Sequence, residues 1–119
     1  MVKPTITSSS LLLDMEGIDK IWSLKSHLEI SLRHITDVKL DSGVVKKIYH
    51  GLKAPGTSIP HVITAGTFYQ KGQRIFWDIH HPKKAVVISL NDETYNKLVI
   101  EVEKPEIFVS RLKEVINNR

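Results

Sequence analysis

The residues whose types could support chemistry are mainly histidines close to one aspartate. Asp78, His80 and His81 stand together in the sequence, and with His34 or His61 they could offer nitrogen and oxygen ligands to a metal ion. Adjacent residues of a strand point to opposite faces, so His80 and His81 are not expected to share one ion. No His-x-His or His-Glu-x-x-His spacing occurs in the chain. We therefore expect no metal site and no cofactor.

Nucleophilic and phosphate-binding chemistry also lack their sequence signatures. The chain contains no cysteine, which excludes a disulfide framework, thiolate zinc sites and cysteine nucleophiles. No Gly-x-Ser-x-Gly elbow is present, and the Pro-Gly-Thr stretch at 55–57 is a lone turn without the lysine of a P-loop. Acid–base catalysis would need a second carboxylate beside Asp78 from a distant strand. We expect a protein that is not an enzyme, and we keep a small metal-dependent enzyme centred on Asp78, His80 and His81 as an alternative.

One predicted strand has a face of mixed polar and aromatic residues. Over residues 74–80 successive side chains point to opposite sides. The apolar side consists of Ile75, Trp77 and Ile79. The other side consists of Arg74, Phe76, Asp78 and His80. Because Trp77 shares its side with two isoleucines, we interpret it as a core residue. If the other side meets solvent, Phe76 is an exposed aromatic in a strip that is typical of protein interfaces.

Positive charge is concentrated in the middle of the chain. The net charge is +4, but residues 43–84 contain seven lysines and arginines and a single acidic residue. Such a segment is either a solvated basic face or a surface that meets anions, such as an anionic membrane. The basic residues that would form this surface are Lys46, Lys47, Lys53, Lys71 and Arg74. With Phe76, Asp78 and His80 they make up the candidate binding surface.

Size and composition predict a single domain over residues 1–119. The chain has 119 residues, of which 41% are hydrophobic and 25% charged, as is usual for globular domains. The leucine run at 11–13 is too short for the core of a signal peptide or for a membrane-spanning helix. The absence of cysteine is compatible with a reducing compartment. These features together lead us to expect a cytoplasmic protein.

Alternation of apolar and polar residues predicts strands along most of the chain. In the second half the expected strands are 62–70, 74–80, 84–90 and 96–103. Lys71 and Gly72 predict a tight hairpin turn between the first two. In the first half the candidates are 10–13, 21–24 and 28–40, with a bend or bulge after Leu32, where the period of two is lost. The connections leave no room for crossover helices, so we expect an antiparallel meander.

A helix is predicted over residues 105–118. Phe108 and Leu112 lie on one apolar stripe with helical spacing, and we expect both to be buried against the sheet. Pro105 suits the first helical position, where its missing N–H would have no partner. The segment 43–61 is different, because its apolar residues repeat with a helical period and are followed by proline- and glycine-rich chain. There we expect an inserted loop that includes a short amphipathic helix.

Two long runs of the sequence resemble the sequences of known domain families. They read SHLEISLRHITDVKL and GTFYQKGQRIFWDIHHPKKAVVISLNDETYNKLVIEVEKPEIFVSRL, and the segments 55–57 and 76–78 add to it. Together they resemble the small bacterial pleckstrin-homology-like (PH-like) domain families, over roughly residues 11–116. The resemblance implies a mainly β fold (α+β), a PH-like antiparallel β-sandwich or partly open barrel capped by a C-terminal helix, and it implies no catalytic residues. The basic pair that eukaryotic relatives use for phosphoinositides is replaced by Lys20 and Lys25 among acidic residues, so that mode of lipid binding is not implied.

These observations lead us to expect a non-catalytic interaction domain. It would bind a protein or peptide partner, through an uncovered strand edge for example, and it could also associate with a second copy of itself. The first alternative is a peripheral protein that binds anionic membranes through the basic segment 43–84. The second is the metal-dependent enzyme named above. A nucleic-acid partner is not expected.

Overall fold

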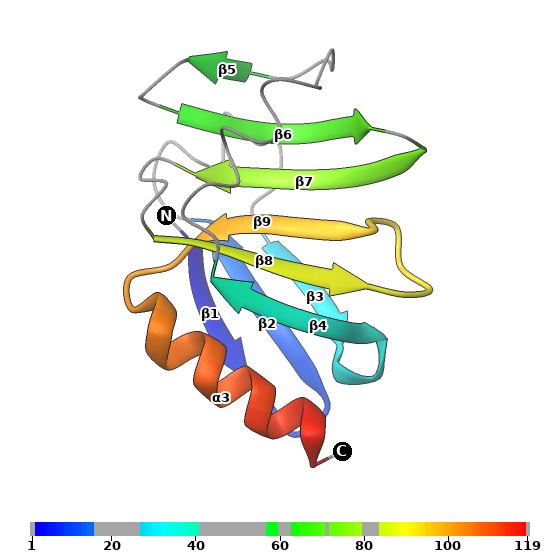
Figure 1. Ribbon diagram of the computed structural model, residues 1–119, viewed down its shortest axis with the longest axis vertical. Helices are drawn as coiled ribbons and strands as arrows, with labels where there is room; N and C mark the ends of the chain where they lie inside the picture. Colours follow the sequence, from blue (N-terminus) through cyan, green and yellow to red (C-terminus); the bar gives the residue numbers. More distant parts are fainter. Residues whose placement is uncertain are drawn as a thin grey trace.

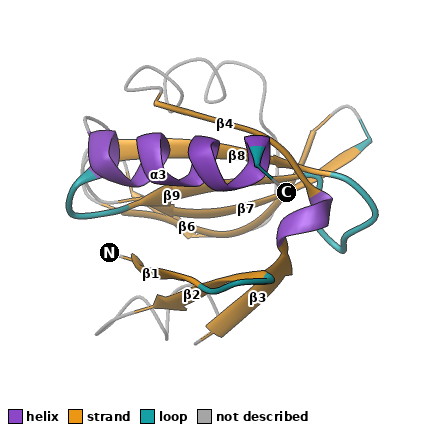
Figure 2. Cartoon of the chain, turned by 90° about the horizontal axis from the view of Figure 1, so that it is seen from below, coloured by secondary structure: helices purple, strands orange, loops and turns teal. Residues whose placement is uncertain are grey.

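The fold consists of two β-sheets and one C-terminal helix (Figure 1). A computed structural model describes residues 2–15, 27–40, 57–59, 63–70, 72–79 and 84–118. The two sheets form two layers, as Figure 2 shows from a second direction. The expected mainly β architecture, a sandwich that is not a closed barrel and carries a helix at its C-terminal end, is confirmed. Among the described residues, no helix has the length and apolar character needed to cross a membrane.

The smaller sheet contains the first three strands in antiparallel order. These are β1 (Val2–Ile6), β2 (Ser10–Met15) and β3 (His27–Ser31), with β2 in the middle. Alternate side chains of β2 are buried, because one face of the sheet meets the core and the other meets solvent. The sequence pattern predicted β2 and β3 but not β1. The strand expected at 21–24 lies outside the described residues.

The larger sheet contains six strands in the order β4-β8-β9-β7-β6-β5. Their bounds are β4 (Ile35–Leu40), β5 (Thr57–Ile59), β6 (Ile63–Gln70), β7 (Gln73–Ile79), β8 (Ala85–Leu90) and β9 (Lys97–Glu101). Strand β5 lies in a stretch expected to be a loop, and that expectation was wrong. The rest of the insertion expected at 43–61 lies outside the described residues.

The path through the larger sheet is not a simple meander. Strand β9 lies between β7 and β8, antiparallel to β8 and parallel to β7. A parallel pair requires a connection that crosses back over the sheet, and we expected that only a helix could provide it. Here β8 itself is part of that connection, since the chain passes through it between β7 and β9. The expectation of a wholly antiparallel arrangement is therefore wrong for this one pair.

Two local irregularities agree with the sequence pattern. A 3-10 turn at Leu32–His34 separates β3 from β4, and the register of β4 against β8 shifts between Ile35 and Asp37. This is the bend predicted after Leu32. The hairpin between β6 and β7 pairs Gln70 with Gln73, and Gly72 adopts a φ of 78°, a left-handed conformation that suits glycine.

Helix α3 (Pro105–Asn117) closes the sandwich along β4 and also contacts β8 (Figure 2). Pro105 occupies the first turn, and Phe108, Val109 and Leu112 are buried. The predicted position of the helix and the burial of Phe108 and Leu112 are confirmed. The main core cluster joins these helical residues to the inner faces of both sheets. A second cluster lies on the opposite face of the larger sheet and contains Trp77 between Ile75 and Ile79, so the assignment of Trp77 to the core is confirmed.

Candidate functional site

The polar and aromatic strip predicted on residues 74–80 is not an exposed surface. Phe76 has no exposed area, and its ring contacts the Tyr95 ring at a centroid distance of 5.5 Å. Interpreting Phe76 as an exposed aromatic was therefore wrong. The physical reason is that β7 lies inside the larger sheet and both of its faces are buried. Its side chains alternate between two core clusters, and not between the core and solvent. Arg74, at the start of the strand, is exposed.

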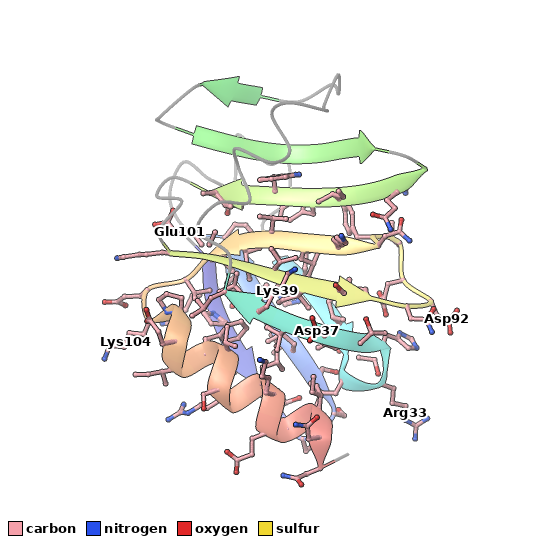
Figure 3. The ribbon with its side chains drawn as sticks, viewed as in Figure 1. Arg33, Asp37, Lys39, Asp92, Glu101 and Lys104 are labelled. Atoms are coloured by element: carbon pink, nitrogen blue, oxygen red, sulfur yellow. The ribbon has the colours of Figure 1, made fainter. Side chains whose placement is uncertain are left out.

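Asp78 is also buried, with no exposed area. Neither of its carboxylate oxygens has a hydrogen-bond partner within the part of the chain that the structure describes. The pKa of Asp78 is raised to about 6, mainly because burial disfavours the charged form; the positive amino terminus of the chain lowers this pKa, and the neighbouring Glu101 carboxylate raises it. Asp78 therefore belongs to the interior, and its contribution to an exposed binding surface was predicted wrongly. Figure 3 labels Glu101, at the end of β9.

The remaining predicted site residues lie outside the described residues. They are Lys46, Lys47, Lys53, Lys71 and His80. The same is true of His61 and His81, which were the other possible metal ligands. His34 is described: it lies in the 3-10 turn before β4, and its Nδ1 pairs with the carboxylate of Glu93 in the loop between β8 and β9. In the part of the chain that the structure describes, no three metal-ligating side chains come together.

A groove of about 900 Å³ runs between β1 and α3. One wall is β1 along its whole length, and residues 102–104, which precede α3, also line the groove. The opposite wall is one side of α3 and consists of Ile107, Phe108, Arg111, Glu114 and Val115. Strand β1 and helix α3 run side by side in the same direction, as Figures 1 and 2 both show. A groove of this volume is within the range of ligand-binding sites in proteins.

The β1 wall presents free backbone groups. The Thr7 N–H donates to the Ser10 carbonyl at 2.8 Å. Because hydrogen-bonded pairs alternate along an antiparallel ladder, Lys3 and Thr5 are the other residues whose backbone groups bond to β2. Backbone direction alternates along a strand, so Val2, Pro4 and Ile6 direct their backbone groups away from β2, toward the outer edge. No described strand pairs with that edge. The same three residues turn their side chains inward, where Val2 is buried and the other two are half-buried.

The α3 wall adds an exposed apolar side chain. Ile107 is 52% exposed, and within the described chain only Leu40 of β4 is a second large hydrophobic residue with comparable exposure. Arg111 and Glu114 follow Ile107 at helical spacing, so the three lie on one side of α3. The partly exposed Ile107 stands beside the buried Phe108, so the groove continues the main core outward to solvent.

Charged side chains surround this apolar surface. They are Lys3, Glu103, Lys104, Arg111 and Glu114. None of them forms an ion pair with another described residue. Lys104 projects outward at the beginning of α3 (Figure 3). Lys3 stands opposite Asp14 in the pairing of β1 with β2, but Asp14 Oδ1 is bonded to His27 Nδ1 at 3.1 Å. The groove thus has an apolar centre and a rim of charges that are available to a partner.

Sequence reasoning missed this groove because it depends on β1. The alternation of Val2, Pro4 and Ile6 with two polar residues is a strand signal, but it extends over only five residues and contains a proline. Comparison of the chain with protein-family models, with curated proteins and with solved structures finds no match. The resemblance to bacterial PH-like domains therefore stays a prediction from the sequence.

Proposed function

We propose that this protein is a non-catalytic interaction domain whose groove between β1 and α3 binds an extended segment of a partner protein. One observation carries the proposal: the outer edge of β1, with which no described strand pairs, is a row of backbone donors and acceptors beside the exposed Ile107. Such a row matches the backbone of another extended chain, and proteins commonly recognise peptides in this way. Neither small ligands nor lipid headgroups offer the same repeating pattern of hydrogen-bonding groups.

The cellular setting forms part of the same proposal. We propose a PH-like interaction domain of the cytoplasm, supported by the two sheets with their C-terminal helix and by a chain without cysteine. The architecture does not by itself identify a function, since one fold can support many. The argument for peptide binding therefore depends on the groove and not on the resemblance.

The proposal can be tested by selecting linear peptides from a random display library against the purified protein. Dissociation constants of the selected peptides are then measured for the parent, for Ile107→Glu and for Leu40→Glu. Both variants replace an exposed large hydrophobic residue of the described chain with the same acid, but only Ile107 lines the groove. Ile107 lies in the first turn of α3, where an acidic residue favours the helix, so the variant is expected to fold.

Burial of a half-exposed isoleucine contributes on the order of 1 kcal/mol, and placing a carboxylate in an apolar contact costs more. We therefore expect Ile107→Glu to weaken peptide binding at least about tenfold and Leu40→Glu to leave it unchanged. Equal affinities of the two variants for the selected peptides, or a library that yields no binder, would refute the proposed function.

A further inference from the structure

We infer that the partner segment joins β1 as an antiparallel fourth strand of the smaller sheet, with apolar side chains at alternate positions, and that Pro4 prevents a second copy of this chain from occupying that place. The inference rests on the proposed function and adds the binding mode, the chemistry of the partner and the residue that excludes self-association. The other strand pairs of the smaller sheet are antiparallel, the arrangement that is slightly more stable per residue.

The hydrogen bonds available to the added strand follow from the backbone of β1. Val2 and Ile6 each present one N–H and one carbonyl at the outer edge, whereas Pro4 presents a carbonyl only. A partner strand can therefore form five backbone hydrogen bonds with these three residues. One partner carbonyl, opposite Pro4, has no donor. A single unmet carbonyl at the solvent-accessible edge can be hydrated, so it does not prevent binding.

The side chains of the partner follow from the same register. Residues directly opposite each other in a sheet point to the same face. Partner residues opposite Val2, Pro4 and Ile6 therefore turn toward Ile107 on α3, which favours apolar side chains there. The intervening partner residues turn to the outer face beside Lys3. Lys3 forms no ion pair with another described residue, so an acidic partner residue is favoured opposite it.

Self-pairing of β1 is penalised by its central proline. A second copy related by two-fold symmetry must run antiparallel, and the longest overlap places Pro4 opposite Pro4 of the other copy. Val2 and Ile6 can then exchange hydrogen bonds with their counterparts, but both proline carbonyls face each other without a donor. Shifted registers bring fewer residues together. Proline on an edge strand is a recognised means of preventing such association. A strand from another protein meets only one Pro4, so only one carbonyl is left without a donor instead of two.

The first test scans a selected peptide that loses affinity for Ile107→Glu. Methylation of single backbone nitrogens should weaken binding about tenfold or more at every second residue and little at the residues between. Alanine substitution should identify the same residues as the apolar contacts, because in an antiparallel pair the hydrogen-bonded residues also face α3. Sensitivity without alternation would refute strand addition, and sensitive positions that alternate out of phase would refute the antiparallel direction. Either result leaves the location of the bound peptide intact, because the loss of affinity in Ile107→Glu is what places the peptide in the groove.

The second test replaces Pro4 with valine, which restores the missing N–H and keeps an apolar side chain. The matched control is Thr5→Val, because the Thr5 N–H already points to β2. We expect Pro4→Val to bind the selected peptide about three- to tenfold more tightly and to dimerise at least about tenfold more strongly in sedimentation equilibrium than the parent or Thr5→Val. Thermal unfolding verifies that each variant folds. Equal dimerisation of Pro4→Val and Thr5→Val, or a parent dimer that Ile107→Glu dissociates, would overturn the role of Pro4.

Discussion

Replacing Asp78 with asparagine should remove a pH dependence that this buried carboxyl gives to the stability of the fold. In the folded protein its pKa is raised to about 6 from an ordinary value of 3.8, mainly because burial disfavours the charged form. Between these two pH values the folded chain binds more protons at this site than the unfolded chain does. The free energy of unfolding therefore falls as pH rises from about 4 through 6, and it levels off above that range.

The size of the effect follows from the difference between the two pKa values. A difference of about 2 corresponds to about 3 kcal/mol, a large fraction of the stability of a small domain. Among the described residues neither carboxylate oxygen has a hydrogen-bond partner, and the opposing effect of the positive amino terminus is smaller than the cost of burying the charge. The amide of Asp78→Asn stays neutral at every pH. We expect this variant to be more stable than the parent by up to about 3 kcal/mol at pH 7 and similar to it near pH 4.

Urea denaturation followed by tryptophan fluorescence, at several pH values from 4 to 8, measures this difference. The control is Asp37→Asn, which makes the same chemical change at an exposed position of β4 (Figure 3). Subtracting the parent curve from each variant curve removes the contribution of every other titratable group that the two proteins share. A stability difference between parent and Asp78→Asn that does not change with pH, or one that Asp37→Asn reproduces, would refute the assignment of a buried, unpartnered carboxyl.

Three further predictions concern the helix, a turn and the basic segment. Phe108→Ala should destabilise the fold by roughly 3–5 kcal/mol, because Phe108 joins α3 to the main core, and unchanged thermal stability would disprove that contact. Gly72→Ala should cost about 1 kcal/mol, because Gly72 has a φ of 78°, and denaturant titration would show it. Lys46→Glu combined with Lys47→Glu should abolish any binding of the parent to anionic vesicles and change stability by under about 0.5 kcal/mol. Vesicle binding that survives both changes would rule these lysines out.

The sequence predicts local structure here better than the contacts between distant strands. The helix begins at Pro105 because proline fits its first turn, and Phe108 and Leu112 are buried as their spacing indicates. Strand β8 was expected to be central from its continuous run of valine and isoleucine, and it lies between β4 and β9. In each case the deciding interaction is between neighbours in the chain or depends on the composition of one segment.

The position of β9 and the environment of Phe76 depend on the whole sheet instead. Val99 and Ile100 are both buried, so nothing local in the sequence indicates which strands flank β9. The alternation around Phe76 was interpreted correctly, but the second layer that covers it comes from other parts of the chain. The groove could not be predicted from local sequence either, because it lies between β1 and α3, which come from opposite ends of the sequence. Only the packing of β1 beside α3 makes Pro4 and Ile107 parts of one surface.

Amide hydrogen exchange at β1, measured by NMR with and without a saturating selected peptide, tests the central claim most directly. The Ile6 N–H points to the free edge, whereas the Thr5 N–H is bonded to β2. Our account predicts rapid exchange at Ile6 and slow exchange at Thr5 in the free protein, and protection of Ile6 when the peptide is bound. An Ile6 amide that is already protected in the free protein, or that still exchanges rapidly in the saturated complex, would contradict the proposal that β1 is a docking edge.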